Sequence, residues 1–245
     1  MKRITLTEQH HQIARLILAT WRPRMDVWAR RIDDPEELGR LNDWAKKKNA
    51  PLYRIGDYRP ERKAGKSLPL TDDVVAAHVA GAHTIGFYPL HPDGTTGSVS
   101  VDFDNHRGTR IVDVDPREEL DRVTAVLLRR GIRHLANVSR GGAGYWLHLF
   151  PPVGTSARVA RAALHAVLNE AGVKHLDRGG TFDALCPKQD ELFVRDGADP
   201  TRSPGNLFCV PCCGRWLSSQ TPGTHFIGTD PLNLNEQATT LQEYV

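Results

Sequence analysis

The stretch that decides the fold is IRHLANVSRGGAGYWLHLF, residues 132–150. Two apolar segments, 132–138 and 144–150, flank a glycine-rich loop, and this arrangement predicts a β-hairpin across the loop. Trp146 and His148 are two residues apart on the second strand, so they share one of its faces. The stretch therefore predicts neighbouring antiparallel strands.

A second hairpin is predicted upstream, from HTIGFYPL (83–90) and GSVSVDFD (97–104) joined by HPDGTTG (91–97). The pattern then predicts a helix capped by Asp115, the hairpin at 132–150, a helix over about 155–172, and a strand at 205–211. Sequential hairpins separated by helices favour an α+β fold with a largely antiparallel sheet backed by helices. They argue against a doubly wound parallel sheet.

The N-terminal region is expected to be helical. Thr5 and Glu8 have capping-box spacing before one helix, and Asp34 is the expected N-cap of a second. Residues 53–69, rich in Arg, Lys, Pro and Gly, are predicted to form a loop, and Thr71 is predicted to cap a short helix that ends at Gly81. We therefore expect a small helical N-terminal appendage over residues 1–50 and a core over residues 51–245.

Composition sets broad limits on function. The chain has 245 residues, of which 40% are hydrophobic and 25% charged, as in ordinary soluble globular proteins. No apolar run approaches the roughly 18 residues of a membrane helix, and the start MKRITLTEQHHQ is too polar for a signal peptide. A cytoplasmic protein without a membrane partner is expected. The net charge of +3 permits a polyanionic partner without demanding one.

The sharpest chemical signal is SVSVDFDNHRG, residues 98–108. In an extended strand Asp102 and Asp104 point to one face, and Val99, Val101 and Phe103 point to the other. Two carboxylates so placed repel each other, and Mg²⁺ or Mn²⁺, which prefer oxygen ligands, would relieve that repulsion. The alternative is a strand end that reaches solvent.

Two further segments are weaker signals. The loop SRGGAG (139–144) resembles a phosphate cradle in which Arg140 adds a bidentate donor, although it is not a Walker motif and its alternative role is a turn between strands. TFDALCPKQD (181–190) offers a third acid, Asp183, and a cation, Lys188. By themselves these two residues indicate little.

The cysteines indicate a reducing compartment rather than a metal site. All four, Cys186, Cys209, Cys212 and Cys213, fall in the last quarter of the chain, which is a poor disulfide framework. CVPCC (209–213) contains one CxxC, but a structural zinc site usually needs two such pairs. Zinc is therefore not expected.

Taken together, TIGFYPL…SVSVDFDNHRG, ANVSRGGAGYWLHLF, FDALCPKQD and GNLFCVP resemble, in this order, the archaeo-eukaryotic-type primase-polymerases. The similarity is closest to the bacterial and mobile-element branch, which includes conflict-system primases and CRISPR-associated primase-polymerases, and it runs from about Tyr53 to the C-terminus. The resemblance implies a palm-like core. Where the close branch often has a cysteine cluster before the first strand, this chain has residues 53–69, without cysteine.

The resemblance also implies site residues. Asp102, Asp104 and Asp183 match the acids that bind two catalytic metal ions, here Mg²⁺ or Mn²⁺. For the incoming nucleotide, the matching or candidate residues are Ser139, Arg140, Gly144, Trp146, His148 and Lys188.

Trp146 stands where the family carries a triphosphate-binding histidine, and His148 stands where the close branch often has tryptophan. In one interpretation the exchange is tolerated: His148 reaches the phosphates from about 7 Å further along the strand, and Trp146 stacks on a base or sugar. In the other, the phosphate contact is lost and activity is weakened.

The expected function is that of a template-dependent nucleotidyltransferase, a DNA primase-polymerase that joins nucleoside triphosphates in replication of a plasmid, phage or mobile element or in a defence system. The expected partners are a single-stranded DNA template or primer, nucleoside triphosphates, and a helicase or other replication protein. Template DNA is expected along residues 59–66 and 129–133. The alternatives are a catalytically weakened single-strand-binding module and a metal-dependent nuclease.

Overall fold

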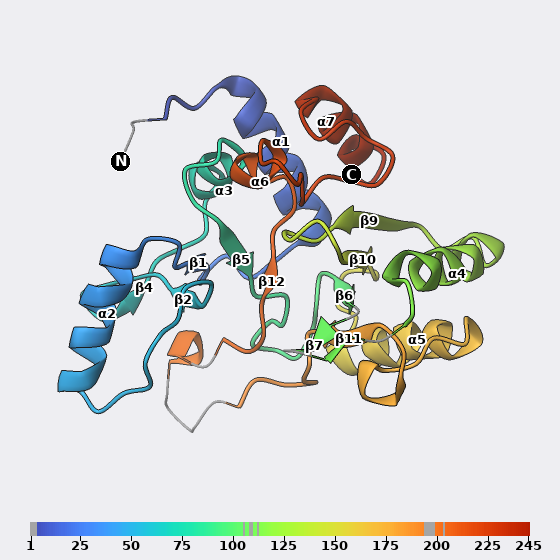
Figure 1. The fold of residues 1–245 in the computed structure, drawn as a ribbon, viewed down its shortest axis with the longest axis horizontal. Helices are drawn as coiled ribbons and strands as arrows, with labels where there is room; N and C mark the ends of the chain where they lie inside the picture. Colours follow the sequence, from blue (N-terminus) through green and yellow to red (C-terminus); the bar gives the residue numbers. More distant parts are fainter. Residues whose placement is uncertain (1–3, 105, 108–109, 112, 194–198, 203) are drawn as a thin grey trace.

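Two four-stranded antiparallel sheets occupy the two halves of the computed structural model (Figure 1). The structure describes residues 4–104, 106–107, 110–111, 113–193, 199–202 and 204–245. The first sheet has the order β12-β5-β1-β2, and its strands are β1 (Ala29–Arg31), β2 (Tyr58–Pro60), β5 (Ile85–Phe87) and β12 (Phe208–Cys209). The second has the order β11-β6-β10-β9, and its strands are β6 (Val99–Phe103), β9 (His134–Val138), β10 (Tyr145–Leu149) and β11 (Phe182–Cys186).

The remaining elements surround these sheets. The helices are α1 (Glu8–Trp21), α2 (Pro35–Lys47), α3 (Asp72–Val79), α4 (Pro116–Arg129), α5 (Ala157–Glu170), α6 (Gly214–Leu217) and α7 (Leu234–Gln242), with 3₁₀ turns at Leu176–Arg178 and Pro200–Arg202. Two small hairpins pair β3 (Arg62–Lys63) with β4 (Lys66–Ser67) and β7 (His106–Arg107) with β8 (Arg110–Ile111). None of the described helices has the length and apolar character needed to span a membrane. This architecture confirms the α+β class.

The hairpin predicted at 132–150 is confirmed, and it sets the register of the second sheet. Trp146 lies opposite Asn137 on β9 and opposite Asp102 on β6. Because opposite residues of antiparallel strands share a face, the side chains of Asp102, Trp146 and His148 lie on one face of the sheet. The alternation predicted for residues 99–103 thus extends across neighbouring strands.

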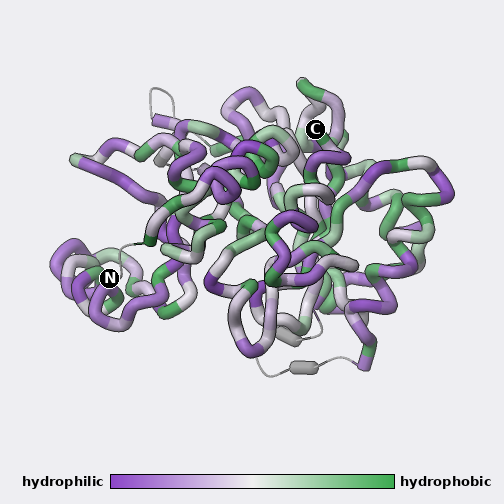
Figure 2. Tube along the Cα trace, turned by 90° about the horizontal axis from the view of Figure 1, so that it is seen from above, coloured by the Kyte–Doolittle hydropathy of each residue, from purple (hydrophilic) through white to green (hydrophobic). Residues whose placement is uncertain are grey.

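The apolar face of the second sheet packs on two helices. Val101, Phe103 and Leu147 are fully buried against α4 and α5, in a cluster that also contains Leu127 and Leu164. In Figure 2 the hydrophobic stretches lie mainly in the interior of each half. The opposite, polar face of this sheet is therefore available for contacts with α1 and the first sheet, and it carries the candidate functional residues.

That polar face is covered at one end. Trp21, at the end of α1, and Phe208 on β12 are buried, and their rings lie 5.1 Å and 5.5 Å from the ring of His148. Asp102, further along the face, is only partly buried. The covering therefore separates a buried end of the sheet from a more accessible end that carries Asp102.

The hairpin predicted over 83–104 is wrong. A tight turn exists, with one bridge between Leu90 and Thr96, but β5 and β6 enter different sheets. Both edges of β5 are occupied by β1 and β12, and both edges of β6 by β10 and β11. Since each strand has two edges, no edge remains for β5 and β6 to pair with each other.

Two local expectations are also corrected. Residues 53–69 are not a plain loop, because β2, β3 and β4 lie within them and β2 pairs with β1. The first helix is capped by Thr7, not Thr5, and the side chain of His10, rather than that of a glutamate, completes the capping box. The predicted caps Asp34, Thr71 and Asp115 are confirmed.

The helical character expected of the first fifty residues is confirmed by α1 and α2. Helix α1 packs against α3 and α7, and β1 pairs with β2 and β5. These contacts join residues on both sides of position 50, and the division of the chain there stays a prediction.

Candidate active site

The three predicted acids lie on or beside β6, one of the two central strands of the second sheet, and on the neighbouring β11. Asp102 lies on β6, between β10 and β11, and Asp104 follows the end of β6, where its backbone N–H donates to the carbonyl of Thr181 at 2.8 Å. Asp183 lies at an irregularity of β11, between Phe182, which is opposite Phe103, and Ala184, which is opposite Asp102. A bulge of this kind re-aims a side chain, and here it lets Asp183 share the face of Asp102.

Charged side chains near Asp102 change the pKa of its carboxyl group. Burial, followed by the negative charges of Asp104 and Asp183, raises the pKa of Asp102 to about 8, and the positive charges of Lys188 and Arg140 oppose this rise. Like-charged carboxylates held together cannot all ionise without neutralisation. This donor set has the chemistry of a site for divalent cations, which oxygen ligands favour.

Lys188 and Asp183 also line a second feature, a cavity of about 430 Å³ at the outer edge of β11. Arg161, His165 and His175 contribute to its wall. Asp183 therefore acts electrostatically on Asp102 and also lines a cavity whose other charged residues are cationic.

The loop 139–144 is a tight turn held against β6. The N–H of Ser139 donates to the carbonyl of Gly144 at 2.7 Å, and the N–H of Gly144 donates to Oγ of Ser139 at 3.1 Å. A Cβ atom on Gly144 would lie 2.7 Å from the carbonyl oxygen of Phe103, so this position requires glycine. The amides of Ser139 and Gly144 therefore bond inside the loop, and the loop carries the side chain of Arg140.

Trp146 lies beside the acids and its ring is only partly buried. The ring stacks on that of His148, with centroids 6.2 Å apart and planes 9° apart, and it also contacts Phe208 at 6.2 Å. The indole therefore separates Asp102 from the buried end of the sheet.

His148 does not lie where a phosphate contact would require it. Its side chain is 0% exposed, Nδ1 accepts from Trp21 Nε1 at 3.3 Å and from the Ser100 hydroxyl at 2.7 Å, and Nε2 donates to Oδ1 of Asn137 at 2.7 Å. Burial lowers the pKa of His148 to about 3, so the imidazole is neutral. Both nitrogens are occupied, and we therefore leave His148 out of the proposed nucleotide contacts.

Sequence reasoning missed three residues next to the glycine loop. Trp216 on α6 is approached by the guanidinium carbons of Arg31, Arg140 and Arg215, at 5.5, 5.7 and 5.6 Å from the ring centroid. Arg31 comes from β1 and Arg215 from α6, at opposite ends of the chain. No local motif could have linked them, because only the fold brings them to Arg140.

The two basic segments expected to carry template differ in their surroundings. Residues 59, 60, 62 and 65 line a cavity of about 1440 Å³ between α2 and the first sheet, with Trp44 at its wall. Residues 129–133 lie at the end of α4, where Arg129 and Arg130 are ion-paired with Glu170. The first segment therefore borders a large cavity.

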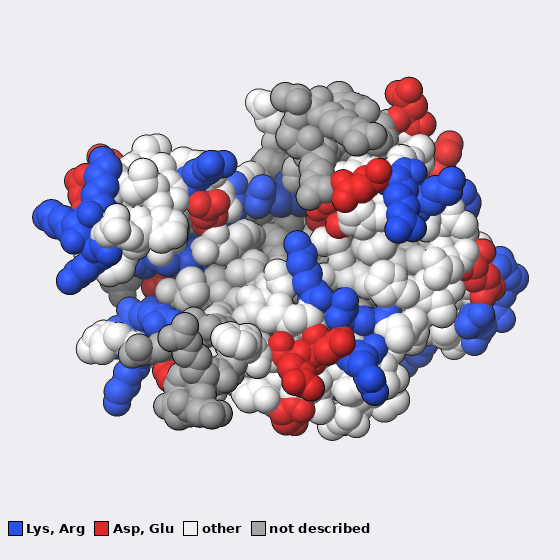
Figure 3. Space-filling model, turned by 90° about the horizontal axis from the view of Figure 1, so that it is seen from below, with Lys and Arg blue, Asp and Glu red and all other residues white. Residues whose placement is uncertain are grey.

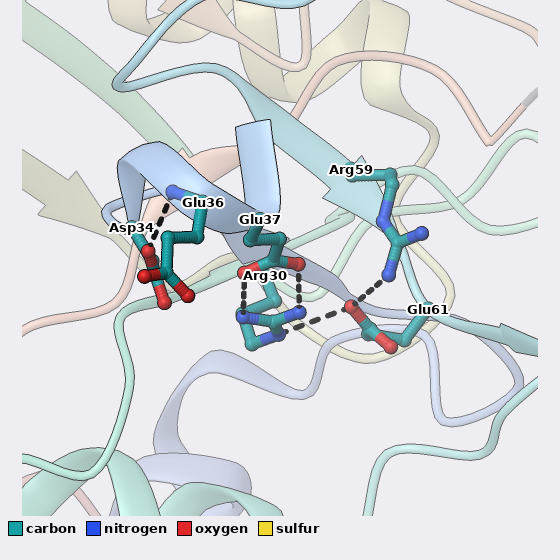
Figure 4. A network of polar contacts seen from close by, with 6 residues as sticks. All are labelled: Arg30, Asp34, Glu36, Glu37, Arg59 and Glu61. Carbon is teal, nitrogen blue, oxygen red and sulfur yellow. Dashed lines mark hydrogen bonds and ion pairs between the residues drawn. The ribbon is translucent and has the colours of Figure 1, made fainter. Parts of the chain in front are cut away.

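Two arginines that line this large cavity, Arg30 and Arg59, are neutralised by ion pairs. Arg30 binds Glu37 and also donates to Glu61 at 3.1 Å, and Arg59 donates to the same Glu61 oxygen at 3.1 Å (Figure 4). Basic and acidic side chains are likewise interspersed over the face seen in Figure 3. Charge alone therefore does not mark one nucleic-acid surface.

The cysteines are buried or partly buried thiols. Sγ of Cys212 lies 3.8 Å from Oε1 of Gln237, and Sγ of Cys213 lies 3.7 Å from Oγ1 of Thr84. Burial raises the pKa of Cys186 to about 12. A separate group, His11 with Asp72 and Asp73, lies on α1 and α3 with His–carboxylate distances of 3.5 and 3.7 Å.

Comparisons with known proteins identify a family and a similar fold. A family model described as "TOTE conflict system, Archaeo-Eukaryotic Primase domain" matches residues 13–244. Among solved structures, the chain is similar to the polymerase domain from Mycobacterium tuberculosis Ligase D in complex with DNA, with a TM-score of 0.53 and 14% identity over 99% of this chain and 96% of that one. At this identity the likeness shows the fold. No curated protein sequence matches the chain.

Proposed function

This chain belongs to the archaeo-eukaryotic primase domain family of TOTE conflict systems, and from that membership we propose that it is a template-dependent DNA primase-polymerase. In the proposed reaction a 3′-hydroxyl attacks the α-phosphate of a nucleoside triphosphate. One O–P bond forms, the bond to the β-phosphate oxygen breaks, and pyrophosphate leaves. The family description names a conflict system, which supports a role in such a system, and the DNA-directed form of the reaction is our proposal.

One observation supports this proposal: the negative charges of Asp104 and Asp183 and the positive charges of Arg140 and Lys188 all act on the carboxylate of Asp102. We propose that the three acids hold two Mg²⁺ or Mn²⁺ ions, which would stabilise the attacking and leaving oxygens. Arg140 and Lys188 would neutralise the triphosphate. In phosphoryl transfer, positioning and charge neutralisation supply most of the rate enhancement, so this small set of residues suffices.

Trp146 is proposed to stack on the base or sugar of the incoming nucleotide. Its ring is partly exposed and lies on the face of Asp102, and aromatic stacking on a base is worth about 1–3 kcal/mol. This assignment retains the expected role of Trp146 without requiring His148 to reach the phosphates.

The template strand is proposed to lie in the cavity between α2 and the first sheet. Trp44, whose side chain is half-exposed, would contact an unpaired base, and the outward-facing Arg40 and Arg62 would contact phosphates. The similar polymerase domain of Ligase D was solved in complex with DNA, which supports a nucleic-acid partner. A helicase or other replication protein as a further partner, and a cytoplasmic location, remain predictions.

The proposal is tested by template-dependent incorporation of labelled nucleotides with Mg²⁺ or Mn²⁺, on primed and unprimed single strands. Metal-dependent products that disappear in Asp102→Asn establish the polymerase, and products from unprimed strands establish a primase. Equal products from wild type and Asp102→Asn would contradict the assignment of the acids.

A second candidate function is a single-strand-binding module without catalysis. The burial of His148 favours it, because the histidine that the family uses for the triphosphate has no accessible counterpart on β10. This candidate predicts salt-sensitive binding of single-stranded DNA and no incorporation under any metal condition.

A further inference from the structure

We propose that Arg31, Arg140 and Arg215 form a polyphosphate subsite around Trp216, which holds the β- and γ-phosphates of a nucleoside triphosphate. The identity of the anion rests on the proposed polymerase function. The existence of an anion subsite rests on the geometry alone.

Three guanidinium groups surround one indole ring, at 5.5–5.7 Å from its centroid. They come from β1, from the glycine loop and from α6, so three separate parts of the fold hold like charges together. Like charges at this spacing are unfavourable unless a counter-charge is present. A cluster that the fold maintains in this way suits an anionic ligand.

The protein supplies part of that counter-charge. Asp33 is ion-paired with Arg31 and lies 3.2 Å from Nη1 of Arg215. Within the described part of the chain, Arg140 forms no ion pair with a carboxylate. Three cations thus face one bound carboxylate, which leaves net positive charge beside Trp216.

Arg31 shows that this charge is not fully satisfied. Its side chain is 11% exposed, and its Nε atom is buried without a hydrogen-bond partner among the described residues. Burial, and next the positive charge of Arg140, lowers the pKa of Arg31. A buried guanidinium nitrogen without an acceptor costs free energy, and a phosphate oxygen is a suitable acceptor.

Arg140 connects the cluster to the carboxylates. Its charge acts on both Asp102 and Arg31, and its guanidinium shares the Trp216 ring with Arg31 and Arg215. A triphosphate whose α-phosphate sits at the acids would extend past Arg140 toward Arg31 and Arg215. Arg31 and Arg215 are consequently placed to recognise the phosphates that distinguish a triphosphate from a monophosphate.

Two substitutions in the Arg215–Asp33 ion pair distinguish a role in phosphate binding from a purely structural role. Arg215→Ala and Asp33→Asn both remove the Arg215–Asp33 contact, but they change the net charge of the cluster in opposite directions. We would measure dissociation constants for ATP, ADP and AMP with Mg²⁺ by titration calorimetry on the full chain. Arg15→Ala, which removes an exposed arginine paired with Glu8, is the matched control.

A polyphosphate subsite predicts that Arg215→Ala weakens ATP binding about tenfold or more, with little effect on AMP, and that Asp33→Asn tightens it. If both substitutions change ATP binding in the same direction, the ion pair is structural and the proposal is overturned. If Arg215→Ala weakens binding of a single-stranded oligonucleotide but not of ATP, the anion is the nucleic-acid backbone, which also overturns it.

Thermal unfolding of each variant shows whether it is folded, and Arg215→Lys, which retains the charge, is expected to recover most of the ATP affinity. The outcome is independent of the polymerase assay. A wild type that incorporates no nucleotide, yet shows opposite effects of Arg215→Ala and Asp33→Asn, supports the subsite while contradicting the proposed polymerase.

Discussion

Trp146 on β10 lies directly opposite Asp102 on β6. An indole therefore occupies the place beside the carboxylates, and the imidazole of His148, two residues further on, is fully buried. The two residues that the sequence presents as an exchanged pair thus differ in environment. One borders the site, and the other is part of the core that supports it.

Replacing Trp146 tests its contact with the nucleotide. Trp146→Ala is expected to raise KM for the incoming nucleotide about tenfold, because stacking on a base contributes about 1–3 kcal/mol. Trp146→Phe, which retains an aromatic ring, is expected to remain within a few-fold of wild type. Steady-state incorporation kinetics measure both variants, and equal KM values for wild type and Trp146→Ala would rule out stacking.

Replacing His148 is expected to act on stability. His148→Ala leaves Ser100, Asn137 and Trp21 with unpaired polar atoms and opens a cavity, so the free energy of unfolding should fall by about 3–5 kcal/mol. Urea denaturation measures the loss. If the variant is as stable as wild type but binds nucleotide less tightly, His148 contacts the nucleotide and the structural assignment is wrong.

Acidification is expected to destabilise the protein through its buried histidines. Burial lowers the pKa of His148 to about 3 and that of His78 to about 4, from the ordinary value of 6.5, so the unfolded chain binds more protons between these values. Stability is therefore present above pH 6.5 and falls as pH decreases toward 4, by up to about 1.4 kcal/mol per pH unit for each histidine. Denaturation at several pH values measures the slope, which should be smaller in His148→Gln. An unchanged slope in that variant would contradict the burial of a neutral imidazole.

Asp102→Asn is expected to separate stability from activity. Because burial, and next the charges of Asp104 and Asp183, raise the folded pKa of Asp102 to about 8, ionising this buried carboxylate costs stability as pH rises from about 4 to 8. Without metal at pH 7, the variant should be more stable than wild type by about 1–2 kcal/mol, and it should incorporate at least about a hundredfold less nucleotide. Mn²⁺ should bind the wild type more tightly as pH rises toward 8. A less stable Asp102→Asn protein would contradict a destabilising, buried Asp102 carboxylate.

Two nearby glycines of one loop provide a matched steric test. Gly144→Ala places a Cβ atom 2.7 Å from the carbonyl oxygen of Phe103, whereas Gly141→Ala meets nothing within 4 Å. Gly144→Ala should displace the loop that carries Arg140 and lower incorporation at least about tenfold, since small misplacements of a positioning group have large kinetic effects. Gly141→Ala should behave as wild type. Equal activities would show that the packing of the loop against β6 does not position Arg140.

Much of the local structure could be predicted from the sequence. Asp34, Thr71 and Asp115 cap their helices as expected, because a capping side chain bonds to amides only two or three residues away. The hairpin at 132–150 also formed as predicted. The hairpin at 83–104 did not, because strand pairing depends on which edges other segments occupy, and that information is spread over the whole chain.

The candidate site divides in the same way. The alternation around Asp102 determined, from the sequence alone, that acids face away from Val101 and Phe103, since side chains alternate in any extended strand. Only the tertiary structure decided which residues from distant segments surround these acids. Trp21 contacts His148 across 127 positions of sequence, and Arg31 reaches Trp216 from the other end of the chain. Burial and charge clustering arise from contacts between such distant segments, so the sequence by itself determined the strand that carries the acids, and the fold decided which residues surround it.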